Sequence, residues 1–190
     1  GVNYKNYNDD LPHDKYLEWM KSVWKECYRV LVRGGRICVN IDATTNIDDQ
    51  VEFQELVHPL HVDFINQFRE LNYIYRGEYC WIKQNSPGSK TSWGSYCRCS
   101  NPRIRRNHEY IIVVSKEDTK LEGDLSLCDL TKYEFHEWTL SEWKINPTSM
   151  KLHPAPFPYD LAKRCIKLFS YVGNTVLDPF NGSGTATTAS

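Results

Sequence analysis

Segments of helical period alternate along this chain with short apolar segments, and this alternation restricts the fold more than any other feature. From 12 to 33, apolar residues recur every three or four positions with Lys and Glu between them, which predicts an amphipathic helix. Two glycines follow, and the apolar run 36–41 predicts a short buried strand. A helix around 60–71 and a strand over 73–83 repeat this succession. Such alternation is typical of an α/β sheet covered by helices on both faces.

The second half of the chain continues this pattern less regularly. A long polar loop over 84–107 precedes a third predicted strand at 110–114, and 117–150 is an irregular, partly acidic insertion. We expect a third helix at 159–169 and a buried strand at 175–177. The doubly wound arrangement favours a central place in the sheet for the 175–177 strand and a place near an edge for the 110–114 strand.

The composition favours a soluble globular protein. Of 190 residues, 41% are hydrophobic, and 23 Lys and Arg against 24 Asp and Glu give a net charge of -1. A nucleic acid or acidic lipid would therefore have to be held by a local patch. No apolar run approaches the roughly 18 residues of a membrane-spanning helix, and the first residues lack a signal-peptide pattern. We expect an intracellular protein that does not contact a membrane.

The cysteines predict neither disulfides nor a metal site. There are 7, an odd number, and none form a Cys-x-x-Cys pair. Cys97, Cys99 and His108 are the closest approach to a zinc site, but a fourth ligand at a workable spacing is missing. Most of the other cysteines have apolar neighbours, where cysteine behaves as a small hydrophobic residue in a reducing compartment.

The segment 175–185 has the architecture of a ligand site, because an apolar run enters a turn with two glycines and then a predicted helix. Gly182 and Gly184 allow the backbone to approach a ligand closely, and a helix start offers N–H groups and a positive dipole end. A P-loop is excluded because the required Lys is missing, and the dinucleotide pattern is excluded because Thr187 replaces its third glycine. The turn alone fits a ligand site and a plain glycine-rich turn equally well.

The sequence His-Pro-Ala-Pro-Phe-Pro occupies 153–158, one predicted helix before this turn. The two segments together strongly resemble the DNA amino-methyltransferases. The resemblance implies a Rossmann-like methyltransferase fold in the family's β-type order, with both segments holding S-adenosylmethionine. The implied cofactor-binding residues are Asp178, Pro179, Phe180, Asn181, Gly182, Gly184 and Thr185 in one segment and His153, Pro154 and Phe157 in the other.

The resemblance extends over nearly the whole chain. Residues 16–31, followed by Gly35 and Arg36, are similar to the helix and strand that follow the family's catalytic loop, and 81–83 to the end of the next strand. The segments 92–96, 101–102 and 108–116 are similar to its target-side loop and the strand after it. The resemblance implies a catalytic-side half at 1–116, an insertion for target recognition at 117–150, and a cofactor-binding half at 151–190.

The family's catalytic loop, (Asp/Asn/Ser)-Pro-Pro-(Tyr/Phe), is absent, because no Pro-Pro pair occurs in the sequence. The segment 178–181 looks similar but belongs to the cofactor site. In the family this loop precedes the first helix, and further strands follow the cofactor segment. We therefore expect a fragment of a Rossmann-like α/β fold that contains no catalytic residue and has no activity of its own.

The loop at 84–107 carries the candidates for contact with DNA. Trp93 and Tyr96 are candidates to stack on an extruded base. The candidates to contact phosphates are Arg103, Arg105 and Arg106. The alternative is that these arginines form a solvated turn and that Trp93 is a core anchor.

Asn40 and Asp42 end the first strand, at the edge where a doubly wound sheet binds its ligands. Polar residues in such places are more often ordinary strand caps, and this interpretation is favoured over a contact with a ligand.

The preferred hypothesis is an S-adenosylmethionine-dependent methyltransferase that modifies N6 of adenine or N4 of cytosine in double-stranded DNA. It would serve a restriction-modification or phage modification system in the cytoplasm, near the nucleoid, of a bacterial, archaeal or phage-infected cell. The alternative is a catalytically inactive nucleic-acid-binding module of the same fold. An NAD-dependent oxidoreductase is disfavoured by the missing third glycine. The target base, the recognition sequence and the oligomeric state, including a homodimer, stay open.

Overall fold

The computed structural model describes residues 11–42, 57–83, 97–100, 107–148 and 157–190, together with the backbones of three short strands nearer the N-terminus. These strands are β1 (Asn3–Tyr4), β2 (Tyr7–Asn8) and β4 (Thr45–Asn46). β1 pairs with β2, and β4 pairs with β5 (Val57–His58), both in antiparallel fashion. No helix in the described part of the chain is long and apolar enough to cross a membrane.

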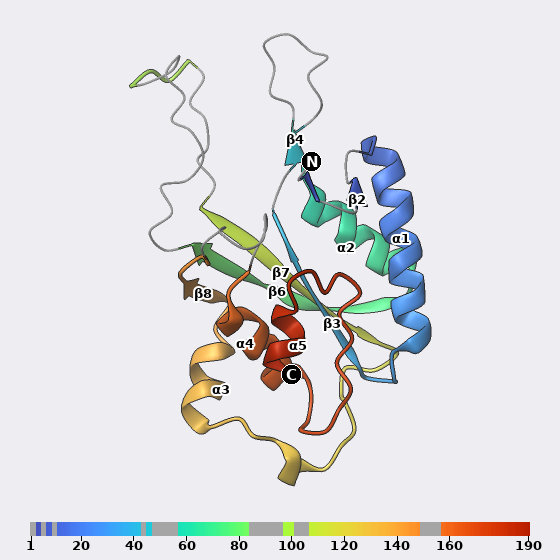
Figure 1. The fold of residues 1–190 in the computed structure, drawn as a ribbon, viewed down its shortest axis with the longest axis vertical. Coiled ribbons are helices and arrows are strands. Elements are labelled where there is room, and N and C mark those ends of the chain that lie inside the picture. The colour runs from blue at the N-terminus through green and yellow to red at the C-terminus, as the bar shows by residue number, and fades with distance from the viewer. Residues whose placement is uncertain are drawn as a thin grey trace.

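A mixed four-stranded sheet in the order β3-β7-β6-β8 forms the centre of the fold (Figure 1). β7 (His108–Lys116) lies between β3 (Arg36–Ile41) and β6 (Tyr73–Lys83) and is antiparallel to both. β8 (Glu142–Ile145) runs parallel to β6 at the edge. β3 and β6 therefore end where β7 begins, and we call this the loop end of the sheet.

Helices cover both faces of the sheet, as the sequence predicts. α1 (His13–Val30) and α2 (Leu60–Glu70) pack on one face, and α4 (Tyr159–Phe169) packs on the other (Figure 1). Consecutive residues of a strand point to opposite faces, so β7 serves both cores. Ile112 and Val114 join Trp24, Phe64 and Phe68 beneath α1 and α2, whereas Ile111 joins Trp81, Trp143 and Leu161 beneath α4.

The insertion at 117–150 contributes a strand to the main sheet. It contains η2 (Leu125–Leu127), α3 (Lys132–Trp138) and β8. Trp143 of β8 is fully buried, stacks on Tyr79 at 4.2 Å between ring centroids, and donates from Nε1 to the Trp138 carbonyl at 3.0 Å. This buried tryptophan joins β8 to the core.

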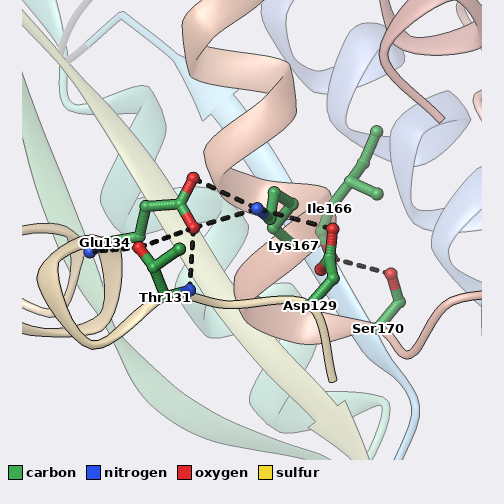
Figure 2. Close-up of polar contacts among 6 residues, drawn as sticks. All are labelled: Asp129, Thr131, Glu134, Ile166, Lys167 and Ser170. Atoms are coloured by element: carbon green, nitrogen blue, oxygen red, sulfur yellow. Dashed lines mark hydrogen bonds and ion pairs between the residues drawn. The ribbon is translucent and has the colours of Figure 1, made fainter. Parts of the chain in front are cut away.

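An ion-pair network joins the insertion to α4 (Figure 2). The Nζ of Lys167 lies 2.9 Å from Glu134 Oε2 and 3.4 Å from Asp129 Oδ2. Glu134 also accepts a hydrogen bond from the backbone N–H of Thr131, which begins α3 with a capping box. These contacts lower the pKa of Glu134 to about 2, with the Thr131 N–H as the largest cause and Lys167 next.

Two predictions about the sheet are wrong. Residues 175–177 form no strand, and the side chains of Val176 and Leu177 are exposed. A strand exists only through hydrogen bonds to a neighbour, and no described strand pairs with this segment. β7 is not near an edge, because β6 and β3 pair with both of its sides, and residues 111–115 are buried for this reason.

Candidate cofactor site

The turn at 178–184 is built from side-chain and backbone hydrogen bonds within itself. Asp178 accepts at Oδ1 from the backbone N–H of Phe180 at 2.9 Å, a local turn that aspartate favours. The N–H of Gly184 then donates to the carbonyl of Asn181 at 2.7 Å. This second bond closes the turn directly before α5 (Thr185–Ala189).

Both glycines of the turn have the left-handed backbone conformation that favours glycine. The φ angle is 49° at Gly182 and 81° at Gly184, which is the N-cap residue of α5. A β-carbon built on Gly184 would meet no atom within 4 Å, so the space beside this residue is open. At Gly184 the turn therefore presents bare backbone to open space, as a site for a closely held ligand requires.

The polar side chains of this turn bind mainly to one another. Thr187 donates from Oγ1 to Asn181 Oδ1 at 2.7 Å, and the hydroxyls of Ser183 and Thr185 lie 3.3 Å apart. These bonds hold the turn against the first residues of α5. Pro179 is exposed and adds rigidity but no polar contact.

Phe180 connects the turn to the first helix of the chain. Its ring meets the indole of Trp19 edge-on, with 5.8 Å between centroids and 67° between planes. Trp19 belongs to α1, far away in sequence. The sequence patterns did not identify this contact, because Trp19 reads only as one apolar position of an amphipathic helix.

Phe157, in the other cofactor segment, packs in the core of the sheet. It is half-buried and packs against the core cluster of Trp81, Ile111 and Leu161 beneath α4. The other cofactor candidates, His153 and Pro154, lie outside the described residues. So do all the DNA-contact candidates, which are Trp93, Tyr96, Arg103, Arg105 and Arg106. The described structure therefore contains the seven cofactor candidates of 178–185 in one turn, and it places Phe157 on the face of the sheet beneath α4.

A second polar group, the Asn40–Glu109–Lys83 cluster, lies at the loop end of the sheet. Asn40 of β3 donates from Nδ2 to Glu109 Oε2 at 2.6 Å, and Lys83 of β6 forms an ion pair with the other carboxylate oxygen. The Glu109 side chain is 16% exposed and that of Lys83 is 27% exposed. The sequence does not predict that Glu109 and Lys83 are partners of Asn40, because the only signal of each is a charge at the end of an apolar strand.

The opposite face of the loop end carries an aromatic group. The His61 ring stacks on Tyr110 with 4.6 Å between centroids, and His108 meets Tyr110 edge-on at 5.2 Å. Burial is the largest of the causes that raise the pKa of the Tyr110 hydroxyl above its ordinary value. Cys97 and Cys99 are exposed, and no cluster of three or more metal-ligating side chains occurs among the described residues.

Known proteins with similar sequences are DNA methyltransferases. The family model described as DNA methylase, for N6 and N4 modification, matches residues 1–190. Type II methyltransferase M.MjaVI of Methanocaldococcus jannaschii is 30% identical over 153 residues, which cover 80% of this chain and 73% of that protein. M.MjaI of the same organism is 34% identical over 179 residues, covering 88% and 57%. M.MthZI of Methanothermobacter thermautotrophicus is 31% identical, and the chain spans about half of its length, 52%.

Solved structures agree with this result. The putative DNA modification methylase TTHA0409 of Thermus thermophilus, in complex with S-adenosyl-L-methionine, matches with a TM-score of 0.75 and 28% identity over 93% of this chain and 67% of that one. The cytosine-N4-specific PvuII DNA methyltransferase matches in fold, with a TM-score of 0.70 and 17% identity over 100% of this chain and 67% of that one. The expected incomplete Rossmann-like methyltransferase fold is confirmed, and the chain belongs to the N6/N4 DNA methylase family.

Proposed function

We propose that this chain is the cofactor-binding and target-side part of a methyltransferase that modifies N6 of adenine or N4 of cytosine in double-stranded DNA. The observation that carries the proposal is the open glycine turn at 178–184, in a chain that the family model matches throughout. The cofactor of this family is S-adenosylmethionine. On the basis of this family membership, we also propose a role in restriction-modification in the cytoplasm of a bacterial or archaeal cell.

The residues present fit this cofactor. When bound, S-adenosylmethionine supplies a methyl group on a positively charged sulfur. Gly184 leaves room for its methionine part beside bare backbone, Gly182 shares the left-handed conformation of this turn, and Phe180, in contact with Trp19, offers an aromatic edge. Asp178 shapes the turn through its bond to the Phe180 N–H. We assign the same role to Pro179, Asn181 and Thr185, and a contact with the cofactor to His153, Pro154 and Phe157.

The chain's contribution to DNA binding is assigned to the 84–107 connection. It leaves β6 at Lys83 and returns to β7 at His108, so both of its ends lie at the loop end of the sheet. Arg103, Arg105 and Arg106 would contact phosphates, and Trp93 and Tyr96 would stack on the extruded base. Phosphate contacts of this kind weaken as salt rises.

The insertion at 117–150 is the proposed target-recognition element, but its charge limits how it can act. It carries eight acidic and three basic residues, which disfavours contact with phosphates. Neutral exposed side chains such as Tyr133 and Phe135 would have to make its contacts with DNA.

Methyl transfer by an extended protein tests this function. The extended protein consists of this chain preceded by a Pro-Pro-Tyr loop and followed by the remaining strands of a relative. We expect it to transfer tritiated methyl groups from S-adenosylmethionine to a mixed-sequence plasmid, and digestion to release N6-methyladenine or N4-methylcytosine. DNA binding without any label would favour the inactive binding module instead.

A further inference from the structure

The Asn40–Glu109–Lys83 cluster contains one polar atom whose hydrogen-bonding capacity is unused. Asn40 Oδ1 is buried and has no hydrogen-bond partner among the residues that the structure describes. The orientation of the carboxamide is fixed, because an ionised carboxylate only accepts hydrogen bonds and Glu109 must therefore face the Asn40 NH₂ group. The oxygen points away from that contact. A buried acceptor without a donor destabilises the folded state until a donor arrives.

Lys83 keeps this arrangement in place. Its ammonium group binds the second carboxylate oxygen of Glu109 and lies 5.2 Å from the centroid of the Trp81 ring. The carboxylate of Glu109 thus accepts from the ammonium group at one oxygen and from the Asn40 amide at the other. The ends of three strands are thereby joined around one oriented carboxamide, so Glu109 and Lys83 are positioning residues for Asn40.

The place of the cluster connects it to the cofactor segments. Asn40 pairs with Ile111 across β3 and β7, and paired residues share one face of a sheet. Ile111 belongs to the core beneath α4, against which Phe157 and Cys38 also pack. Asn40 therefore lies on the face of the sheet that carries Phe157, at the end from which the 84–107 connection leaves.

We propose that Asn40 Oδ1 accepts a hydrogen bond from an amine of a ligand bound at the loop end. This inference rests on the proposed methyltransferase function. That function offers two sources of such a donor, the ammonium group of the methionine part of S-adenosylmethionine and the exocyclic amine of the target base. Both present N–H groups to a neutral acceptor.

Asn40→Leu in the extended protein tests the inference. The change keeps the side-chain size but removes the acceptor. The matched control is Gln67→Met. Gln67 is also a buried carboxamide whose oxygen has no partner in the described part of the chain, but it lies between α1 and α2 and donates to the Leu17 carbonyl. Comparable losses of melting temperature in the two variants would show that the two substitutions destabilise the fold equally.

Two binding measurements separate the two sources. If the cofactor ammonium is the donor, calorimetry should give about tenfold weaker binding of S-adenosylmethionine to Asn40→Leu. Binding of 5′-methylthioadenosine, which lacks the amino-acid part, should stay unchanged. If the base amine is the donor, cofactor affinity should stay unchanged and affinity for target duplex should fall about tenfold. That loss should vanish for a duplex whose target base lacks its exocyclic amine.

Glu109→Gln provides a second variant in case Asn40→Leu does not fold. A glutamine can donate to Asn40 and so release its orientation, and we expect a smaller loss with the same ligand selectivity. A purely structural role would weaken all ligands equally. Wild-type affinity for both ligands in the Asn40 and Glu109 variants, with methyl transfer intact, would overturn this inference alone. No methyl transfer by the unmodified extended protein would instead overturn the proposed function.

Discussion

At the scale of single residues, comparing substitutions of Gly184 and Gly173 distinguishes an effect on ligand binding from an effect on the stability of the fold. Gly184 and Gly173 have similar left-handed φ angles, 81° and 86°, and at both positions a β-carbon would meet no atom within 4 Å. Replacing either by Val therefore imposes a similar backbone strain, roughly 1–2 kcal/mol. Only Gly184 belongs to the turn assigned to the cofactor.

We expect Gly184→Val in the extended protein to abolish binding of S-adenosylmethionine, because the new side chain occupies the open space that the ligand needs. Gly182→Val should have the same effect. Gly173→Val should lower the melting temperature by a similar amount but keep the affinity of the unmodified protein. Calorimetry and thermal denaturation measure the two quantities. Equal cofactor affinity in Gly184→Val and the unmodified protein would remove the turn from the site.

At the scale of elements, the ion pairs between α3 and α4 should make stability depend on pH in acid. The pKa of Glu134 is lowered to about 2 in the folded chain, from an ordinary value near 4.5. A lowered carboxyl pKa stabilises the folded state above the unfolded pKa, and that stabilisation is lost as pH falls towards the folded pKa. We expect the melting temperature to fall between about pH 4.5 and pH 2.

Glu134→Gln should reduce this acid dependence, because the amide does not titrate. Glu137→Gln is the matched control, since Glu137 is an exposed glutamate of the same helix. Thermal melts followed by circular dichroism from pH 6 to pH 2 compare the three proteins. Parallel curves for the unmodified chain and Glu134→Gln would contradict the role given to this carboxylate.

The strand β8 should depend on Trp143 for its place at the sheet edge. Trp143 is fully buried and stacks on Tyr79, so Trp143→Ala removes a large apolar contact and leaves a cavity. Such changes cost about 3–5 kcal/mol. Tyr133→Ala, at a side chain that is 73% exposed, should cost less than about 1 kcal/mol. Urea denaturation measures both, and similar midpoints in the two variants would contradict the docking of β8 through this residue.

The elements that the sequence predicts are those whose pattern is local. The strands 36–41 and 73–83 are observed over the predicted residues, because their apolar and β-branched side chains and flanking turns are sufficient signals. The strand at 175–177 fails, because strand formation depends on a neighbour that no local pattern reveals. The sequence does not predict β8, because its four residues are too few to show a period. They form a strand only by pairing with β6.

The candidate site also contains residues that a local motif predicts and residues that it does not. The turn at 178–184 was identified because its glycines and Asp178 form a contiguous motif. Glu109 and Lys83 were not identified, because they lie 26 positions apart and meet only when β6 pairs with β7. Contacts between strand ends require knowledge of register, which a single sequence does not provide.

At the scale of the whole molecule, the residues assigned to ligand binding do not include the family's catalytic loop. Methyl transfer to an exocyclic amine leaves positive charge on the attacking nitrogen, and a catalyst must stabilise that charge more in the transition state than before it. The family resemblance assigns this task to the Pro-Pro-Tyr loop, and the 190 residues contain no Pro-Pro pair. Gly184 and Asn40 are proposed to bind ligands, and tight binding alone does not accelerate the transfer step.

We therefore expect the 190-residue chain alone to incorporate no tritium from S-adenosylmethionine into a mixed-sequence plasmid, under conditions in which the extended protein does. The extended protein with both loop prolines replaced by Ala is the control, because it restores the chain length and the remaining strands but not the loop. If the control stays inactive, the missing activity lies in the loop rather than in an incomplete fold. Tritium incorporated by the 190 residues alone would show that a catalytic group lies within this chain, and Asn40 would then be the first residue to replace.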